Sequence, residues 1–269
     1  MISLLDQATV LITGASSGLG AEFARQLAPR TRCLILAARR LDRLEALRLQ
    51  IARPGLVIHC LPVDLANPQD SARFFDEVRK LDVKINVLIN NAGLGDHGLF
   101  EDSDWNRVQA MIDVNVTALT RVTHAFIKDL VRSGRGGILN VSSIASLLPV
   151  PQMTVYAAVK SYVTSFSEGL RAELRGTGLS VLALCPGPVD TEFFDIAERS
   201  NSDGAQAAPA LMKVPASQVV REGLVALETD CARVIPGWIV WGVMTAAILT
   251  PMWIKRHFLN RRGRGFTGH

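Results

Sequence analysis

The feature that most constrains the fold of this chain is an alternation of two hydrophobic patterns. Short runs that are apolar throughout alternate with longer stretches in which apolar residues recur at helical spacing. Continuous apolar runs are typical of strands buried on both faces, and such strands occur in parallel sheets that helices cover on both sides. Because parallel crossovers are right-handed, the alternation predicts an α/β fold with a doubly wound parallel sheet.

The predicted elements extend from residue 9 to residue 236. We expect strands at 9–13, 33–38, 56–63, 86–90, 137–142, 179–185 and 232–236. We expect helices at 18–28, 40–52, 67–80, 104–132, 154–175 and 216–227. Asn67 would cap the third helix, with Pro68 in its first turn. A chain of 269 residues without a linker or repeat favours a single domain at 1–235, followed by an extension at 236–269.

The composition argues against several classes of protein. The net charge is +4, yet five basic residues lie among the last fifteen, and the remainder has 24 basic against 25 acidic residues. We therefore expect no nucleic-acid partner. The start has no secretory signal pattern, and the five histidines show no metal-ligand spacing, so we expect no metal site.

The four cysteines form no CxxC pair, and each lies in or beside an apolar run. This placement favours small core residues in a reducing compartment, which predicts a cytoplasmic protein. The cysteines are Cys33, Cys60, Cys185 and Cys231.

The first predicted strand leads into a glycine-bearing turn, TGASSGLG at 13–20. Gly14 would allow the tight turn, while Gly18 and Gly20 would let the backbone approach a phosphate and let the helix pack on the sheet. The start of the helix offers N–H groups and a positive dipole end to a pyrophosphate. The spacing is G-x-x-x-G-x-G rather than G-x-G-x-x-G, and the alternative is a tight connection without a ligand.

The second predicted strand ends in AARR at 37–40 and holds no carboxylate. An acidic residue there would accept from a ribose 2′-hydroxyl, whereas an arginine accommodates a 2′-phosphate, so Arg39 favours NADP(H) over NAD(H). The alternative is that Arg39 and Arg40 are solvated residues at a helix start, which suits Arg40 better. Asp64, after the third strand, would accept from the adenine amino group or serve as a loop or cap residue.

Tyr156 and Lys160 lie four residues apart in VYAAVK, so both side chains occupy one face of a predicted helix. Polar and small residues also follow other strands, where doubly wound sheets bind their ligands. These are NNAG at 90–93, Ser142 with Ser143, and CPGPVDT at 185–191. The alternative for Tyr156 and Lys160 is an exposed pair on a helix surface.

Together these motifs resemble those of the short-chain dehydrogenase/reductase family. T-G-x-x-x-G-x-G, N-N-A-G, a serine thirteen residues before the tyrosine of Y-x-x-x-K, and P-G-x-x-x-T occur in the family's order across about residues 7–235. The resemblance implies a seven-stranded, Rossmann-like fold. It also implies hydride transfer between a nicotinamide and an alcohol or ketone carbon, carried out by an Asn–Ser–Tyr–Lys group.

The resemblance gives each member of that group a role. Tyr156 would be the acid/base, and Lys160 would lower the pKa of Tyr156 and bind the nicotinamide ribose. Ser143, thirteen residues before Tyr156, would hydrogen-bond the substrate oxygen. Asn115 would hold a water molecule linked to Lys160. Ser142 fits the spacing less well and would bond backbone instead.

The resemblance also implies the residues that bind the cofactor, NADP (NADPH). Thr191 and the backbone N–H of Val189 would hold the nicotinamide carboxamide, in a turn shaped by Pro186 and Gly187. The expected set is Gly14, Ser16, Ser17, Gly18, Leu19, Gly20, Arg39, Asp64, Leu65, Asn91, Ala92, Gly93, Tyr156, Lys160, Pro186, Gly187, Val189 and Thr191.

The loops after the fourth, fifth and sixth strands would shape the substrate pocket, with candidates at Leu94, in 145–153 and in the loop 188–215. The apolar candidates are Leu147, Leu148, Val150, Met153, Phe193 and Phe194. They favour a hydrophobic ketone or secondary alcohol of a lipid, steroid-like or 3-oxoacyl type. We favour a plain loop residue at His97 and a packing role for Tyr162.

The extension WIVWGVMTAAILTPMWI at 238–254 is almost wholly apolar and precedes five basic residues. Its seventeen residues are at the short edge for a spanning helix, while three tryptophans and the basic flank suit a membrane interface. We favour a helix that covers the substrate pocket or a subunit interface, with peripheral membrane contact through 238–264 or a true span as alternatives. The resemblance implies a homodimer or homotetramer formed through the helices at 104–132 and 154–175.

Three functions remain open from the sequence. The first is an NADP(H)-dependent oxidoreductase that acts on a hydrophobic ketone or secondary alcohol. The second is a catalytically silent NADP(H)-binding regulatory protein, against which the intact Asn115, Ser143, Tyr156 and Lys160 argue. The third is a membrane-associated lipid keto-reductase with the same chemistry.

Overall fold

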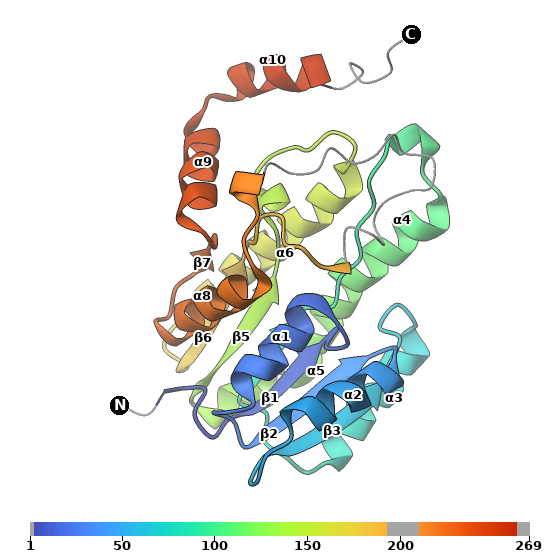
Figure 1. The fold of residues 1–269 in the computed structure, drawn as a ribbon, viewed down its shortest axis with the longest axis vertical. Helices are drawn as coiled ribbons and strands as arrows, with labels where there is room; N and C mark the ends of the chain where they lie inside the picture. The colour runs from blue at the N-terminus through green and yellow to red at the C-terminus, as the bar shows by residue number, and fades with distance from the viewer. Residues whose placement is uncertain (1–2, 193–209, 263–269) are drawn as a thin grey trace.

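The computed structural model describes residues 3–192 and 210–262, and its core is a sheet of seven parallel strands (Figure 1). The strands lie in the order β3-β2-β1-β4-β5-β6-β7. They are β1 Thr9–Thr13, β2 Cys33–Ala38, β3 Val57–Pro62, β4 Val87–Asn90, β5 Gly136–Val141, β6 Leu179–Leu184 and β7 Arg233–Val234. The predicted doubly wound, Rossmann-like sheet is confirmed, while the domain boundary at 235 stays a prediction.

Helices fill the connections between the strands. The α-helices are α1 Gly18–Leu27, α2 Leu41–Ile51, α3 Pro68–Lys80, α4 Trp105–Ile112, α5 Leu119–Ser133, α6 Thr154–Glu173, α8 Ala216–Glu228, α9 Trp238–Leu249 and α10 Met252–Arg262. The 3-10 helices are η1 Phe100–Asp102, η3 Ile144–Leu147 and η4 Ala210–Met212, and η2 Asp113–Ala118 is a π-helix. Asn67 caps α3 as predicted, because its side chain accepts from the backbone N–H groups of Gln69 and Asp70.

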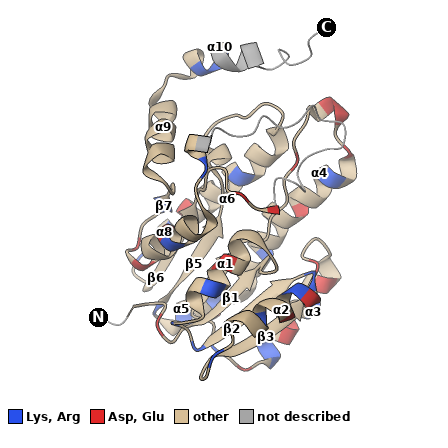
Figure 2. Ribbon diagram, viewed as in Figure 1, with Lys and Arg blue, Asp and Glu red and all other residues tan. Residues whose placement is uncertain are grey.

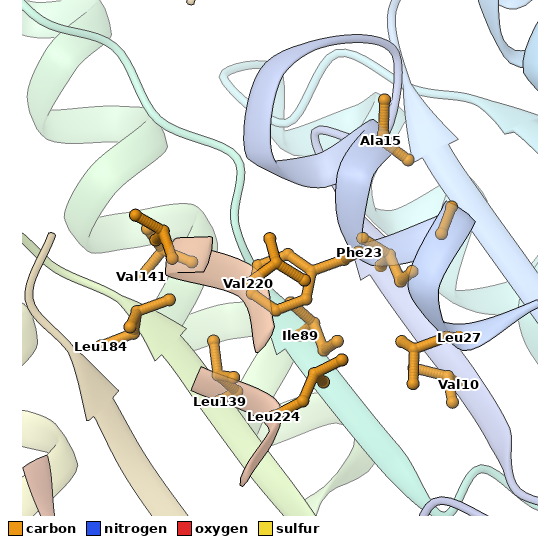
Figure 3. Close-up of a cluster of buried hydrophobic side chains, with 14 of the residues drawn as sticks. Val10, Ala15, Phe23, Leu27, Ile89, Leu139, Val141, Leu184, Val220 and Leu224 are labelled. Atoms are coloured by element: carbon orange, nitrogen blue, oxygen red, sulfur yellow. The ribbon is translucent and has the colours of Figure 1, made fainter. Parts of the chain in front are cut away.

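Alternate residues of each strand build two hydrophobic cores, one on each face of the sheet. In one core, α1, α2 and α8 pack on side chains such as Val10 and Leu139 (Figure 3). In the other, α3, α5 and α6 pack on the neighbouring residues Leu11 and Ile138. Burial on both faces explains why the central strands are apolar throughout.

Two predicted helices are interrupted. The predicted helix 104–132 consists of α4, the π-helix η2 and α5 in succession. The apolar segment 238–254 is divided where Thr250 takes an extended conformation before Pro251, which cannot continue α9. In residues 3–192 and 210–262, no helix has both the length and the apolar character needed to cross a membrane.

The cysteines differ in burial. Cys33 and Cys185 are buried and Cys60 is partly buried, as expected of core residues. Cys231 is exposed, so its predicted place in the core is wrong. It lies in the turn between α8 and β7, and β7 is an edge strand of the sheet.

Candidate active site

The carboxyl ends of β1 and β4 lie side by side at the centre of the sheet, where the strand order reverses. The segments that follow them touch, because a Cβ atom on Gly14 would lie 2.8 Å from the Cα atom of Ala92. The hydroxyl of Thr13 accepts hydrogen bonds from the backbone N–H groups of Asn91 (3.0 Å) and Ala92 (3.1 Å). The glycine turn and the NNAG segment therefore border one site.

The glycine turn depends on its glycines for conformation and space. Gly14 and Gly18 have φ angles of +66° and +55°, which disfavour other residues. A Cβ atom on Gly20 would lie 2.1 Å from the carbonyl oxygen of Gly14. The Asn91 side chain holds the turn by donating to the carbonyl oxygens of Thr13 (3.0 Å) and Gly14 (3.1 Å). The turn therefore places backbone without side chains next to the start of α1. The N–H groups and the dipole of the helix favour an anion there.

Two arginines lie beside this turn. Arg40 donates to the hydroxyls of Ser16 (3.3 Å) and Ser17 (3.0 Å) and to Glu192 Oε2 (3.3 Å). Arg43, one turn into α2, donates to both carboxylate oxygens of Glu192 (2.7 and 2.8 Å). The hydrogen bonds from Arg43 lower the pKa of the Glu192 carboxyl. Two guanidinium groups on one carboxylate form a site that also suits a phosphate group.

Arg40 and Arg43 were not predicted from the sequence as residues of a phosphate site. Arg39, which the sequence favoured, is exposed and stays a prediction. The spacing of Arg40 and Arg43 at the start of a helix was the available signal, since residues three apart share a helix face.

Asp64 and Leu65 follow β3 at the same edge of the sheet. Asp64 accepts from the N–H of Ala66 (3.1 Å), and its own N–H donates to Asp70 in the first turn of α3 (2.7 Å). Leu65 packs against the core beneath α3. These contacts fix the turn after β3, and the adenine contact of Asp64 stays a prediction.

Tyr156 and Lys160 are both buried on α6, so the alternative of an exposed helix pair is wrong. The Ser143 hydroxyl hydrogen-bonds the phenol, and it also accepts from the N–H of Ala145 (3.1 Å). The Lys160 ammonium lies 5.8 Å from the centre of the Tyr156 ring and donates to the carbonyl oxygen of Val141 (3.0 Å). The predicted serine, tyrosine and lysine therefore meet at the end of β5.

Burial controls the protonation of this pair. It raises the pKa of Tyr156 to about 12. The hydrogen bond with Ser143 lowers the pKa of Tyr156, but by less than burial raises it. Burial lowers the pKa of Lys160 to about 8. The prediction that the pKa of Tyr156 falls is therefore wrong, because desolvation disfavours the phenolate more than its neighbours favour it. At neutral pH Tyr156 is a phenol with a proton to donate.

Asn115 lies in the π-helix η2 and is buried. Its amide nitrogen donates to the carbonyl oxygens of Leu94 (2.8 Å) and Met111 (2.9 Å). Its buried Oδ1 has no hydrogen-bond partner among the residues that the structure describes. A Cβ atom on Gly93 would lie 2.9 Å from that oxygen and 3.3 Å from the Lys160 ammonium, so Asn115 and Lys160 face one narrow space. Buried polar atoms are nearly always paired, which fits the water molecule predicted there.

Ser142 bonds backbone, as predicted. Its hydroxyl donates to the carbonyl oxygen of Lys160 (2.9 Å) and pairs with Thr164 (2.7 Å). The ring of Tyr162 stacks on Phe166, as expected of a packing role, and its hydroxyl pairs with Thr120 (2.8 Å), while the side chain itself is exposed.

The segment after β6 closes the site from the other side. The carbonyl oxygen of Pro186 accepts from the N–H of Ile144 (3.0 Å), next to Ser143. Thr191 lies opposite the glycine turn, because its Cβ atom would be 3.5 Å from a Cβ atom on Gly18. Val189 is buried. Pro-Gly, Thr191 and the glycine turn thus border the same site.

A narrow pocket leads to Tyr156 from the start of α6. It is lined by Asp96, Gly98, Phe100, Ser103, Val108, Met111, Gln152, Met153, Thr154, Val155 and Tyr156. Of the predicted apolar lining, Met153 is present, whereas Leu147 and Leu148 pack on the sheet core. Phe193 and Phe194 lie outside the described residues.

Two titratable groups lie near this pocket. Asp96 is buried and forms an ion pair with Arg107 (3.4 Å), and the buried Nδ1 atom of His97 has no hydrogen-bond partner within the described part of the chain. In that part of the chain, no group of three or more His, Cys, Asp or Glu could hold a metal ion.

Comparisons with known proteins agree with this geometry. The family model described as short chain dehydrogenase matches residues 8–202. A sulfoacetaldehyde reductase from Chromohalobacter salexigens is 39% identical over 191 residues, which cover 68% of this chain and 73% of that protein. An 11-beta-hydroxysteroid dehydrogenase from Pinus massoniana is 32% identical over 254 residues, covering 94% of this chain and 69% of that protein. The solved structure of a short-chain dehydrogenase from Sphingobium yanoikuyae in complex with NADPH is 32% identical, with a TM-score of 0.79 and coverage of 94% of this chain and 95% of that chain.

Proposed function

Since the chain belongs to the short-chain dehydrogenase/reductase family of oxidoreductases, we propose that it transfers a hydride between NADP(H) and an apolar ketone or secondary alcohol. The observation that carries the proposal is the buried phenol of Tyr156, which hydrogen-bonds Ser143 and lies one helical turn from Lys160. A structural helix has no need to bury a phenol and an ammonium together, because both groups are costly to desolvate.

The residues around the glycine turn fit a nicotinamide dinucleotide. The glycine turn and the start of α1 would hold the pyrophosphate, and Gly20 leaves no room for a side chain there. Arg40 and Arg43 would hold a 2′-phosphate, which supports NADP(H) over NAD(H). When bound, the nicotinamide supplies or takes up the hydride. The NADPH in the Sphingobium yanoikuyae structure also supports this preference.

The catalytic residues would move a proton at the substrate oxygen. In ketone reduction Tyr156 donates its phenolic proton to that oxygen, and Ser143 orients the oxygen by hydrogen bonding. Lys160 and Asn115 face the space beside Gly93, so a water molecule there would return a proton to the site. The raised pKa of Tyr156 suits the reductive direction, since the phenol stays protonated at neutral pH.

The substrate class is proposed from the pocket that leads to Tyr156. Its apolar members, Phe100, Val108, Met111, Met153 and Val155, outnumber the side chains that carry a charge. The hydroxysteroid dehydrogenase relative supports a bulky apolar substrate, whereas the sulfoacetaldehyde reductase relative favours a small anionic one. The two classes of substrate are therefore separable by experiment.

Initial rates should be measured with NADPH and with NADH against apolar ketones of increasing size and against sulfoacetaldehyde. The proposal predicts a higher kcat/KM for the apolar ketones than for sulfoacetaldehyde, and at least a tenfold preference for NADPH. Equal efficiency with NADH would remove the role given to Arg40 and Arg43. Turnover of sulfoacetaldehyde alone would overturn the apolar substrate class and leave the oxidoreductase chemistry standing.

We also propose that copies of the chain associate through α4, α5 and α6. These helices carry exposed aromatic side chains, Trp105 on α4 and Tyr162 on α6. Sedimentation velocity would show a homodimer or homotetramer, and a monomer at micromolar concentration would contradict the proposal.

A further inference from the structure

The described part of the chain ends in an arm made of α9 and α10, residues 238–262, which stands apart from the sheet in Figure 1. The arm exposes large apolar side chains to an unusual extent. The exposed fractions are 81% for Trp238, 57% for Trp241, 77% for Leu249 and 73% for Trp253. Three of the four tryptophans of the chain therefore lie on one exposed segment.

Among residues 3–192 and 210–262, the contacts of α9 with the rest of the protein lie on one face of the helix. Val240 and Met244, four residues apart, are buried, and Val240 would lie 3.2 Å from a Cβ atom on Gly187. The N–H of Gly237 donates to Glu222 (3.1 Å) and fixes the start of the helix. A surface helix of a soluble protein normally carries polar residues opposite its buried face. Here the opposite face is apolar as well, so α9 has a second surface that needs a partner.

The same arm is strongly basic. No acidic residue follows Asp230, whereas six basic residues do, so residues 231–269 carry +6 and residues 1–230 carry −2. Arg256 is exposed on α10, and the Lys255 ammonium donates to the carbonyl oxygen of Ile248 at the end of α9 (3.0 Å). Figure 2 shows the described residues of α9 free of charge and basic residues on α10. The exposed apolar surface thus borders positive charge on a segment whose own sequence holds no acidic residue.

The charge discriminates between two occupants of this surface. A second copy docked by twofold symmetry would bring two arms of +4 together, and their repulsion opposes association. An anionic bilayer complements the charge, and its interface accepts tryptophan rings and apolar side chains. With 12 residues α9 is about 18 Å long, too short for a hydrocarbon core of about 30 Å. We propose that the arm binds in the interface of an anionic phospholipid bilayer, with the tryptophans and Leu249 inserted and the basic residues at the headgroups.

The full chain should be tested for flotation with vesicles of phosphatidylcholine alone and of phosphatidylcholine mixed with phosphatidylglycerol. The proposal predicts binding to the anionic vesicles, weakened by salt. Arm tryptophans should be quenched by brominated lipid in the Trp105→Phe protein, which keeps only Trp238, Trp241 and Trp253. Absence of vesicle binding or of quenching would overturn the proposal.

Matched variants identify the arm as the binding element. Leu249→Ser should reduce vesicle binding about tenfold, whereas Leu49→Ser, at a site 74% exposed on α2, should leave it unchanged. Both variants should keep the wild-type thermal midpoint, because both side chains are exposed. An equal loss in both variants would overturn the proposal.

Reversing the charge of two basic residues on α10 provides an independent test of vesicle binding. The Lys255→Glu, Arg256→Glu double variant should lose the preference for anionic vesicles. The Arg79→Glu, Lys80→Glu double variant at the end of α3 is the control and should retain that preference. A different outcome would overturn the proposal. If the wild type does not bind vesicles and Leu249→Ser loses self-association, the exposed surface of the arm contacts a second copy of the chain.

Discussion

Replacing Lys160 by methionine should abolish activity and make the protein more stable at neutral pH. Lys160 is buried beside Tyr156, and burial lowers its pKa from 10.5 to about 8. That shift means that the fold disfavours the ammonium by about 3 kcal/mol relative to the neutral amine. Methionine has a similar length and no charge, but it leaves the carbonyl oxygen of Val141 without its donor, which costs about 1 to 2 kcal/mol. The variant should therefore gain about 1 to 2 kcal/mol in the free energy of unfolding.

The pH dependence makes the prediction specific to the buried charge. Because the folded-state pKa of Lys160 lies below the unfolded value, the folded protein binds fewer protons between pH 8 and 10.5. Wild-type stability therefore rises with pH through that window, and the variant lacks this contribution. The stability difference between variant and wild type should shrink by about 2 kcal/mol between about pH 7 and about pH 9.5.

Urea unfolding followed by circular dichroism at both pH values measures this difference. Lys128→Met, at an exposed position on α5, is the matched control and should show no such change. A stability difference that is the same at both pH values would show that Lys160 is not a buried, destabilised cation.

Three further predictions concern the cofactor site. Arg40→Ala should raise the KM for NADPH by about 10- to 100-fold and leave the KM for NADH unchanged. The same two KM values measured for Arg39→Ala show which of the two arginines faces the 2′-phosphate. Glu192→Gln should lower the KM for NADPH by about two- to fivefold at low salt, because it removes a carboxylate that competes for Arg40; an unchanged KM would contradict this competition. Gly20→Ala should abolish NADPH binding in a fluorescence titration, since its Cβ atom would overlap the carbonyl oxygen of Gly14, whereas Gly169→Ala, with no atom within 4 Å, should bind normally.

The sequence was sufficient to predict the sheet and the pairing of Tyr156 with Lys160. Continuous apolar runs require burial on both faces, and parallel order then follows from helical connections of fixed hand. The spacing of Tyr156 and Lys160 places them on one face of α6 wherever that helix packs. Local patterns of this kind predict the structure correctly because the tertiary packing favours the same arrangement.

Features that depend on packing were not predictable from local patterns. The pKa of Tyr156 follows from how completely α6 is covered, and burial outweighs the hydrogen bond from Ser143. The π-helix that turns Asn115 toward Lys160 arises between two ordinary helical segments. Arg40 rather than Arg39 meets Ser17, and the sequence AARR does not show which of its two arginines faces the glycine turn.

We propose Tyr156 as the proton donor in ketone reduction with NADPH. The most direct measurement is the kcat of Tyr156→Phe with NADPH and the best ketone, together with the NADPH dissociation constant of the same protein. We expect a loss in kcat of about 100- to 10,000-fold with NADPH binding retained, because phenylalanine keeps the ring and removes the acid. A kcat close to that of the wild type would contradict the account, as would a wild-type protein that binds NADPH and turns over no ketone.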